Sequence, residues 1–145
     1  MNLRQIRHVI NARIYNNCII DQDKFSSELN SEYIFKNKYA SKNLIVGVSG
    51  GPDSMLLSHL LKKHSEKFGY SVTAVIIDHK LRESSQKEAL LTKNRLNIMG
   101  LKTTILSLNK YHKKTSIQEW ARFERLNALS GFAKSKNGIL LLGHH

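Results

Sequence analysis

The sequence predicts an α/β fold, a doubly wound parallel sheet with helices on both faces. Four short apolar runs, most of them rich in β-branched residues, follow one another from residue 43 onward. Helical patterns separate these runs in strict alternation, which is typical of parallel strands joined by crossover helices. A glycine-rich turn lies between the first run and the first helix, where open α/β sheets bind their ligands.

Each apolar run is short enough for a strand and has no polar face. Strands buried on both sides read in this way, because helices cover both faces of a parallel sheet. The four predicted strands are NLIVGV at 43–48, SVTAVIID at 71–78, LKTTILSL at 101–108 and GILLLG at 138–143.

Helices are predicted between the strands, at 54–67, 83–99 and 116–134. Four leucines form the apolar face of the first: Leu56, Leu57, Leu60 and Leu61. Ser116, with Glu119 three residues later, has the spacing of a helix-capping pair. The crossovers are expected to be right-handed.

The first 42 residues are predicted to be a helical extension, followed by one domain over 43–145. Apolar residues within 1–17 recur near helical spacing, and a second short helix is expected at about 24–35. Three arginines and no acid before Asp21 resemble an organelle transit segment in charge. The segment is poor in serine, so an ordinary N-terminal helix is favoured.

Composition excludes several classes of protein. A 145-residue chain that is 41% hydrophobic suits one compact domain, and no apolar run is long enough to cross a membrane. There is no secretory signal pattern, and the single cysteine, Cys18, excludes an internal disulfide and a Cys-x-x-Cys metal site. A cytoplasmic location fits. The net charge of +12 favours a polyanionic partner such as nucleic acid over a merely lysine-rich surface.

The turn SGGPDS at 49–54 is the most specific stretch of the chain. Gly50 and Gly51 allow positive φ and close approach of the backbone to a ligand. Their N–H groups and the start of the following helix form a nest for an anion. Pro52 suits the first helical turn, where its missing N–H has no consequence.

The polar side chains of this turn point to phosphate and a cation. Ser49 and Ser54 can donate hydroxyl hydrogen bonds to phosphate oxygens, and Asp53 is suited to Mg²⁺ held between the carboxylate and the phosphates. The turn lacks the lysine of the Walker loop. The alternative interpretation is an ordinary glycine-rich turn without a ligand.

SGGPDS resembles the pyrophosphate loop of the ATP pyrophosphatases, which split ATP between its α and β phosphates and adenylate a carbonyl oxygen. The resemblance implies that Ser49, Gly50, Gly51, Pro52, Asp53 and Ser54 bind ATP, with Mg²⁺ on Asp53, in an adenine nucleotide α-hydrolase-like (Rossmann-like) fold. The loop taken by itself leaves many substrates open.

A second segment, IDHKLRESSQKEA at 77–89, follows the second strand. Its start borders the first loop in a doubly wound sheet, so Asp78 and His79 are expected to line the nucleotide pocket, and Lys80 and Arg82 to reach phosphates or RNA. The alternatives are a turn cap for Asp78 and a polar loop residue for His79. The segment resembles the D-H-x-L-R-x-x-S-x-x-E-A signature of tRNA(Ile)-lysidine synthases. The matching residues are Asp78, His79, Leu81, Arg82, Ser85, Glu88 and Ala89.

A third segment, SIQEWARFERLNAL, places Arg122 and Arg125 on one helix face. Two guanidiniums suit phosphate binding, the alternative being a solvated face. Trp120 and Phe123 are expected in the core rather than stacked on a base. The segment resembles the same family's Q-x-x-A-R-x-x-R-Y helix, with Leu126 in place of tyrosine. The matching residues are Gln118, Ala121, Arg122 and Arg125.

The last strand runs into His144 and His145, which resemble the start of the family's H-H-x-D-D-x-x-E-T segment. The acidic pair of that segment is not within the 145 residues, so the domain is expected to be incomplete at this end. Two adjacent histidines point in different directions, so a metal shared by this pair is not expected.

The resemblance implies ATP-dependent ligation of L-lysine to the wobble cytidine of a tRNA(Ile) with a CAU anticodon, through an adenylated intermediate. It implies catalytic roles for Asp53, Arg122 and His144, with Arg125 binding RNA or phosphate and main chain near Val48 and Ile77 framing the adenine. The oligomeric state is left open, with a homodimer considered. The alternatives are a truncated ATP-binding fragment or pseudoenzyme, and another PP-loop adenylating enzyme.

Overall fold

The computed structural model describes residues 43–108 and 116–143. Four parallel strands form one sheet in the order β3-β2-β1-β4, and three helices connect them. The elements, in chain order, are β1 Asn43–Val48, α4 Pro52–Phe68, β2 Ser71–Asp78, α5 Ser85–Ile98, β3 Lys102–Ser107, α6 Ile117–Ser135 and β4 Gly138–Leu142. The predicted helices of the N-terminal extension, and His144, lie outside the described residues.

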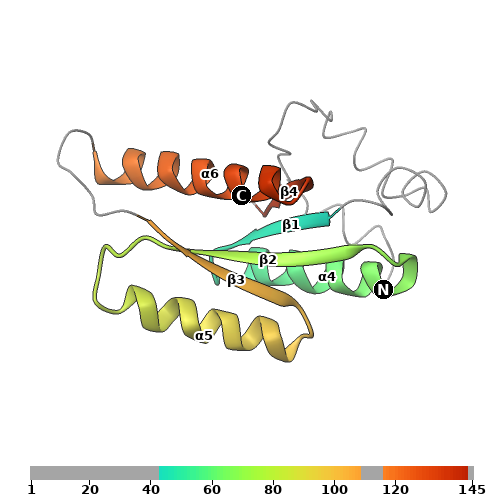
Figure 1. Cartoon of the computed structure of the whole chain (residues 1–145). Helices are drawn as coiled ribbons and strands as arrows, with labels where there is room; N and C mark the ends of the chain where they lie inside the picture. Colours follow the sequence, from blue (N-terminus) through green and yellow to red (C-terminus); the bar gives the residue numbers. More distant parts are fainter. Residues whose placement is uncertain (1–42, 109–115, 144–145) are drawn as a thin grey trace.

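The sheet is covered on both faces (Figure 1). Helices α4 and α5 lie on one face, and α6 lies on the other. The first two crossovers extend the sheet from β1 to β3, and the third returns to place β4 on the other side of β1. The predicted doubly wound parallel sheet is therefore confirmed, with all four strands and three helices in the predicted order.

The core explains why the strand sequences are apolar without alternation. Leu44, Val46 and Val48 pack with residues of α4 and α5, whereas Ile45, between them, packs with Leu129 of α6. Successive side chains of a strand point to opposite faces, so a strand with a helix layer on each side needs an apolar residue at every position.

The boundaries differ slightly from those predicted. Helix α4 begins at Pro52 rather than Ser54, because proline's fixed φ suits the first helical position and Gly51 precedes it in an extended conformation. Ser116 caps α6 by accepting a hydrogen bond from the Glu119 N–H, as predicted. The expectation that Phe123 is a core residue is wrong, because its side chain is 62% exposed on the outer face of α6.

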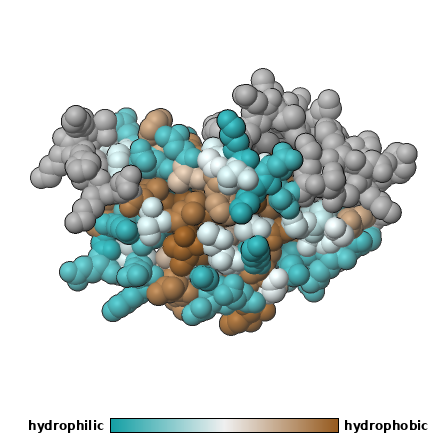
Figure 2. All heavy atoms as spheres, viewed as in Figure 1, coloured by the Kyte–Doolittle hydropathy of each residue, from teal (hydrophilic) through white to brown (hydrophobic). Residues whose placement is uncertain are grey.

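One face of the molecule is less polar in its middle than around it. Figure 2 shows apolar side chains gathered there, between the more hydrophilic surfaces of α6 and α5. Strand β3 is the edge strand on this side and pairs only with β2 among the described residues. Its six residues are fewer than the eight of β2, and a short edge strand exposes few unpaired backbone groups. Within 43–108 and 116–143, no helix is both long and apolar enough to cross a membrane.

Candidate functional site

A cavity of about 180 Å³ opens at the carboxyl ends of β1, β2 and β4. Ligands of doubly wound sheets bind at this edge. The turn after β1 and the start of α4 form part of the wall, and residues of α5 and α6 close it from the two faces of the sheet. The volume is below the roughly 300–1,000 Å³ that encloses a whole drug-sized ligand, so the cavity would hold only part of such a ligand.

The turn 49–54 is held in shape by its own hydroxyl groups. The Ser54 hydroxyl accepts a hydrogen bond from the Ser49 N–H at 3.2 Å and donates one to the Gly51 carbonyl at 3.0 Å. The Ser49 and Ser54 hydroxyls also lie 3.2 Å apart, and the Gly51 N–H donates to Ser49 Oγ at 3.4 Å. Gly50 has a φ of +87°, a left-handed conformation that favours glycine. The turn is thus preformed, with Ser49 and Ser54 both lining the cavity.

The end of β4 lies against the start of α4. A Cβ atom added to Gly143 would lie 3.4 Å from the Asp53 carbonyl carbon and 3.4 Å from Ser54 Cα. A Cβ atom added to Gly47 would lie 2.5 Å from Leu142 Cδ2, so that leucine side chain would have to shift. Gly47 and Gly143 both line the cavity where β1, β4 and α4 come together.

A tight turn after β2 directs the polar residues of the second segment. Asp78 is buried, at 5% exposure, and its Oδ1 accepts a hydrogen bond from the Lys80 N–H at 3.0 Å. Lys80 has a φ of +51°, which is uncommon for a residue with a side chain, and the Asp78 hydrogen bond supports it. The turn sends His79 into the cavity and Lys80 outward into a neighbouring groove.

His79 and Arg125 meet in the cavity from β2 and α6. Burial lowers the pKa of His79, and the nearby Arg125 guanidinium lowers it further, while Asp78 opposes both. Burial also lowers the pKa of Arg125, as does the second guanidinium, Arg122. His79 Nδ1 and Arg125 Nε are buried without a hydrogen-bond partner in the structure. Buried polar groups are rarely left unpaired, so both nitrogens mark a place for a polar ligand.

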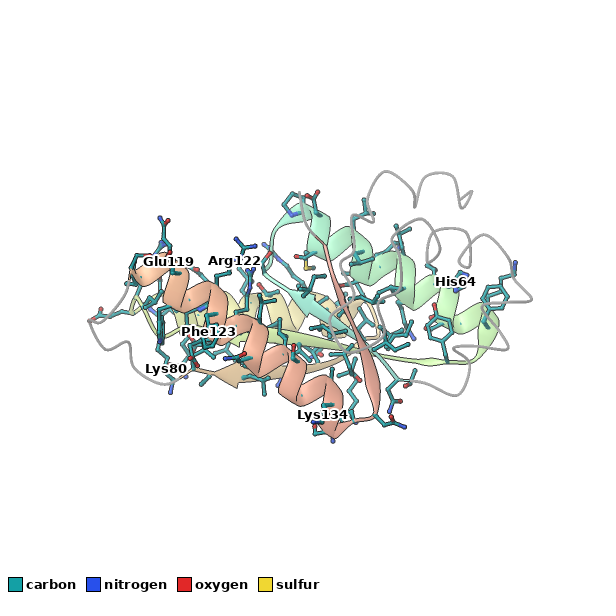
Figure 3. The ribbon with its side chains drawn as sticks, turned by 90° about the horizontal axis from the view of Figure 1, so that it is seen from above. His64, Lys80, Glu119, Arg122, Phe123 and Lys134 are labelled. Carbon is teal, nitrogen blue, oxygen red and sulfur yellow. The ribbon has the colours of Figure 1, made fainter. Side chains whose placement is uncertain are left out.

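An open groove of about 590 Å³ adjoins this edge of the sheet. Asp78 and Ser107, at the ends of β2 and β3, form its base, and Lys80 and Arg82 line it as well. Figure 3 shows Lys80 at the same end of the molecule as Glu119, Arg122 and Phe123 of α6, with His64 of α4 toward the opposite end. Cationic side chains therefore gather around the carboxyl edge of the sheet.

The structure divides the predicted site residues among the cavity, the groove, the turn 49–54 and helix α6. Four line the cavity: Ser49, Ser54, His79 and Arg125. Three line the groove: Asp78, Lys80 and Arg82. Four belong to the turn 49–54 without lining the cavity wall: Gly50, Gly51, Pro52 and Asp53. Arg122 lies exposed on α6, and His144 is outside the described residues.

The sequence predicted no binding role for α5, although three of its residues match the family signature. Four of its residues line the cavity: Ser85, Glu88, Ala89 and Thr92. Their spacing of three, one and three positions puts them on one helix face. That spacing is a signal in the sequence, but only the packing of α5 beside β2 turns this face toward the turn 49–54.

The side chains at this site suit a cation that takes most of its coordinating atoms from a bound substrate and from water. No group of three or more His, Cys, Asp or Glu side chains in the described part of the chain could hold a metal ion. Asp53 is the acidic residue in the first turn of α4. Mg²⁺ commonly binds through one or two carboxylates and substrate phosphates, with water completing the shell. A single carboxylate in the turn 49–54 would meet that requirement if the turn bound phosphate.

Fold and site together define a doubly wound α/β domain with a preformed glycine-rich turn beside a cavity at the carboxyl edge of the sheet. The family model described as the PP-loop domain matches residues 22–145, and the chain belongs to this family. ATP use follows from membership of the family. A solved structure of NMN synthetase from Francisella tularensis has the same fold, with a TM-score of 0.53 over 76% of this chain and 53% of that one. At 15% identity, this likeness concerns the fold alone.

Several curated relatives of this chain are named tRNA(Ile)-lysidine synthases. The tRNA(Ile)-lysidine synthase of Wolbachia pipientis wMel is 36% identical over 83% of this chain and 28% of its own length. A probable tRNA(Ile)-lysidine synthase of Schizosaccharomyces pombe is 32% identical over 77% of this chain and 26% of its own length. The enzyme of Rickettsia akari is 28% identical over 85% and 28%, respectively. The chain thus spans about a quarter of the length of the curated relatives that it matches.

Proposed function

We propose that this chain is the ATP-binding catalytic part of a tRNA(Ile)-lysidine synthase. ATP would adenylate the 2-oxo group of the wobble cytidine in a tRNA(Ile) with a CAU anticodon, releasing pyrophosphate. The ε-amine of L-lysine would then attack that carbon, and AMP would leave. Such an activity belongs where tRNA is processed, which is the cytoplasm in most cells.

The observation that carries the proposal is the pair of unpartnered nitrogens, His79 Nδ1 and Arg125 Nε, in the cavity next to the turn 49–54, the proposed phosphate turn. Arg125 stays cationic although its pKa is lowered, so leaving its Nε–H unpaired is unfavourable. An anionic or polar atom of a bound nucleotide would satisfy it. Membership of the PP-loop family supports a nucleotide as the ligand of this cavity.

The cavity wall suggests how the nucleotide would lie. Leu129 and Leu142 supply apolar surface, and main chain at Val48 and Ile77 supplies hydrogen-bonding groups for a base. The phosphates would then lie toward the turn and the start of α4, where the helix dipole favours negative charge. Asp53 would hold Mg²⁺ there together with phosphate oxygens. The ion would offset charge that develops on the departing pyrophosphate.

Arg122 and His144 complete the proposed catalytic set. Arg122 is exposed on α6 and acts on the pKa of Arg125, so the two guanidiniums lie close together. Their combined charge would stabilise a leaving pyrophosphate. His144 directly follows Gly143, which lines the cavity, and it would contact the α-phosphate or the adenylated intermediate.

The groove beside the cavity is the proposed contact for the tRNA. Lys80 and Arg82 line it, and the groove shares the end of β2 with the cavity, so a nucleotide flanking the reacting cytidine would lie within reach of both side chains. Phosphate contacts of this kind weaken with salt, because binding releases counterions from the nucleic acid. The net charge of +12 adds a long-range attraction.

The test is transfer of labelled lysine to unmodified tRNA(Ile) with a CAU anticodon in the presence of Mg-ATP. Label on this tRNA, and none on a tRNA with a GAU anticodon, is the expected result. Asp53→Ala should abolish transfer. Lys80→Gln with Arg82→Gln should weaken tRNA binding and lower its salt dependence, whereas Lys134→Gln, at the far end of α6, serves as the matched surface control.

A second candidate is a nucleotide-binding unit that does not modify tRNA. It would bind ATP in the same cavity, whose lining by Ser49, His79 and Arg125 needs no contribution from RNA. ATP binding without lysine transfer, measured in the same preparation, would support it over the first. Adenylation of a different carbonyl acceptor would point to another PP-loop enzyme, and failure to bind ATP would contradict all three.

A further inference from the structure

The side chain of Thr92, on α5, packs against Gly50 of the phosphate turn. Its side chain is buried, at 8% exposure, and lines the cavity together with Ser49 and Ser54. A Cβ atom added to Gly50 would lie only 2.8 Å from Thr92 Oγ1, so the hydroxyl is packed against the residue with the left-handed φ. Three residues with hydroxyl groups, two from the turn 49–54 and one from α5, therefore line one cavity.

The three hydroxyls differ in what they bond. Those of Ser49 and Ser54 hold the turn together through hydrogen bonds within 49–54. The Thr92 hydroxyl forms no hydrogen bond with any group of the described residues. A side chain with this degree of burial is normally satisfied by the protein or by a ligand. The free hydroxyl is thus the one of the three that can turn to a ligand without loosening the phosphate turn.

We propose that Thr92 is a further nucleotide-binding residue, whose hydroxyl donates a hydrogen bond to an anionic oxygen of the nucleotide at the phosphate turn. This inference rests on the proposed ATP binding and adds α5 to the phosphate site. A charge-assisted hydrogen bond from a buried hydroxyl is short and strong, and the position beside Gly50 leaves little space for a larger group.

Three substitutions separate ligand binding from packing. Thr92→Ser keeps the hydroxyl and removes the methyl group. Thr92→Val keeps the shape and replaces the hydroxyl with a methyl group, and Thr92→Ala removes both. ATP affinity by calorimetric titration and thermal unfolding are measured for each variant of the full chain.

The expected result is ATP affinity within about twofold of the parent chain for Thr92→Ser, and a loss of about tenfold or more for both Thr92→Val and Thr92→Ala. Thermal stability should not follow this order, because Thr92→Val keeps the packing. If Thr92→Ala binds ATP as well as the parent, the hydroxyl has no ligand role and the inference is wrong. If Thr92→Ser is as weak as Thr92→Val, Thr92 acts by packing. Absence of ATP binding by the parent chain would instead refute the proposed function, and the inference with it.

Discussion

The polar side chains named at the two ends of the sheet differ in whether they are hydrogen-bonded within the protein. At the amino end, Asn43 Nδ2 donates to the Lys136 carbonyl at 2.9 Å, and the Ser71 hydroxyl donates to Asn43 Oδ1. Beside them, His64 Nδ1 and the Tyr70 hydroxyl are hydrogen-bonded at 2.8 Å. At the carboxyl end, His79 Nδ1 and Arg125 Nε are buried without a hydrogen-bond partner, and the Thr92 side chain lines the same cavity.

This difference distinguishes polar side chains that stabilise the fold from polar side chains that are available to bind a ligand. A polar group that is paired within the protein contributes to folding, whereas an unpaired buried group reduces stability until a ligand satisfies it. Substitutions at the amino end should therefore change stability and leave ligand binding intact. Substitutions at the carboxyl end should change ligand binding, and some of them should leave stability unchanged or higher.

The largest expected effect is that of Gly50→Ala. The new Cβ would meet Thr92 Oγ1 at 2.8 Å and would force an L side chain into a φ of +87°. We expect a loss of stability of about 1–3 kcal/mol and a fall in ATP affinity of at least about tenfold, measured by chemical unfolding and calorimetric titration.

Gly69→Ala is the matched control for this substitution. Gly69 also has a positive φ, of +75°, but its Cβ would have no neighbour within 4 Å, and it caps α4 at the end away from the cavity. It should lose about 1–2 kcal/mol of stability from the backbone alone and keep its ATP affinity. Equal losses of ATP affinity in the two variants would show that the phosphate turn has no special role.

Arg125→Met should move stability and ligand binding in opposite directions. The methionine keeps an apolar stem and removes a half-buried guanidinium whose Nε has no partner. We expect ATP affinity to fall about tenfold, while the free energy of unfolding stays the same or rises by up to about 1 kcal/mol. Lys134→Met on the same helix should change neither quantity. A clear loss of stability in Arg125→Met would mean that the guanidinium supports the fold.

Tyr70→Phe tests the amino end. It removes the hydroxyl that bonds His64 Nδ1 and that donates to the Leu61 carbonyl at 3.4 Å. We expect a loss of about 1 kcal/mol in the free energy of unfolding and no change in ATP affinity. A weakened ATP affinity would break the proposed separation between the two ends.

The smallest expected effect is a pH dependence of stability that arises from His79. Its pKa is lowered in the folded chain, chiefly by burial and by Arg125, whereas the unfolded chain has the ordinary value of about 6.5. Below that pH the unfolded chain binds more protons, so the free energy of unfolding falls as pH falls, with a slope of at most about 1.4 kcal/mol per pH unit. His79→Asn should remove this part of the slope below about pH 6.5. An unchanged slope in the variant would show that His79 is not the group responsible.

Several features of the site could be predicted because the signal is local. SGGPDS combines glycine, proline and hydroxyl residues in one turn, and each acts through its own backbone or its near neighbours. Ser49, Ser54 and His79 were expected at the ligand and line the cavity. Thr92 was missed, since nothing near it in sequence distinguishes it from a helix residue on an ordinary face.

Phe123 shows the opposite failure. An aromatic residue within an amphipathic pattern was expected in the core, yet it is 62% exposed, while Leu129 and Ala133 make the buried face of α6. Helix α6 has nineteen residues, and at 3.6 residues per turn its apolar side chains do not all lie on one straight line along the helix. The apolar pattern at the start of α6 therefore does not determine which helix face packs against the sheet at its end.

The sequence by itself determined the order and kind of the elements, the phosphate turn and the family, because strand runs, turn chemistry and cap residues act over a few neighbouring positions. Only the tertiary structure decided which side chains share a cavity. His79 and Arg125 are 46 positions apart in sequence, and Gly50 and Thr92 are 42 apart. Parallel crossovers bring such distant segments to one edge of the sheet, and the burial that leaves their polar groups unpaired arises only when the layers pack.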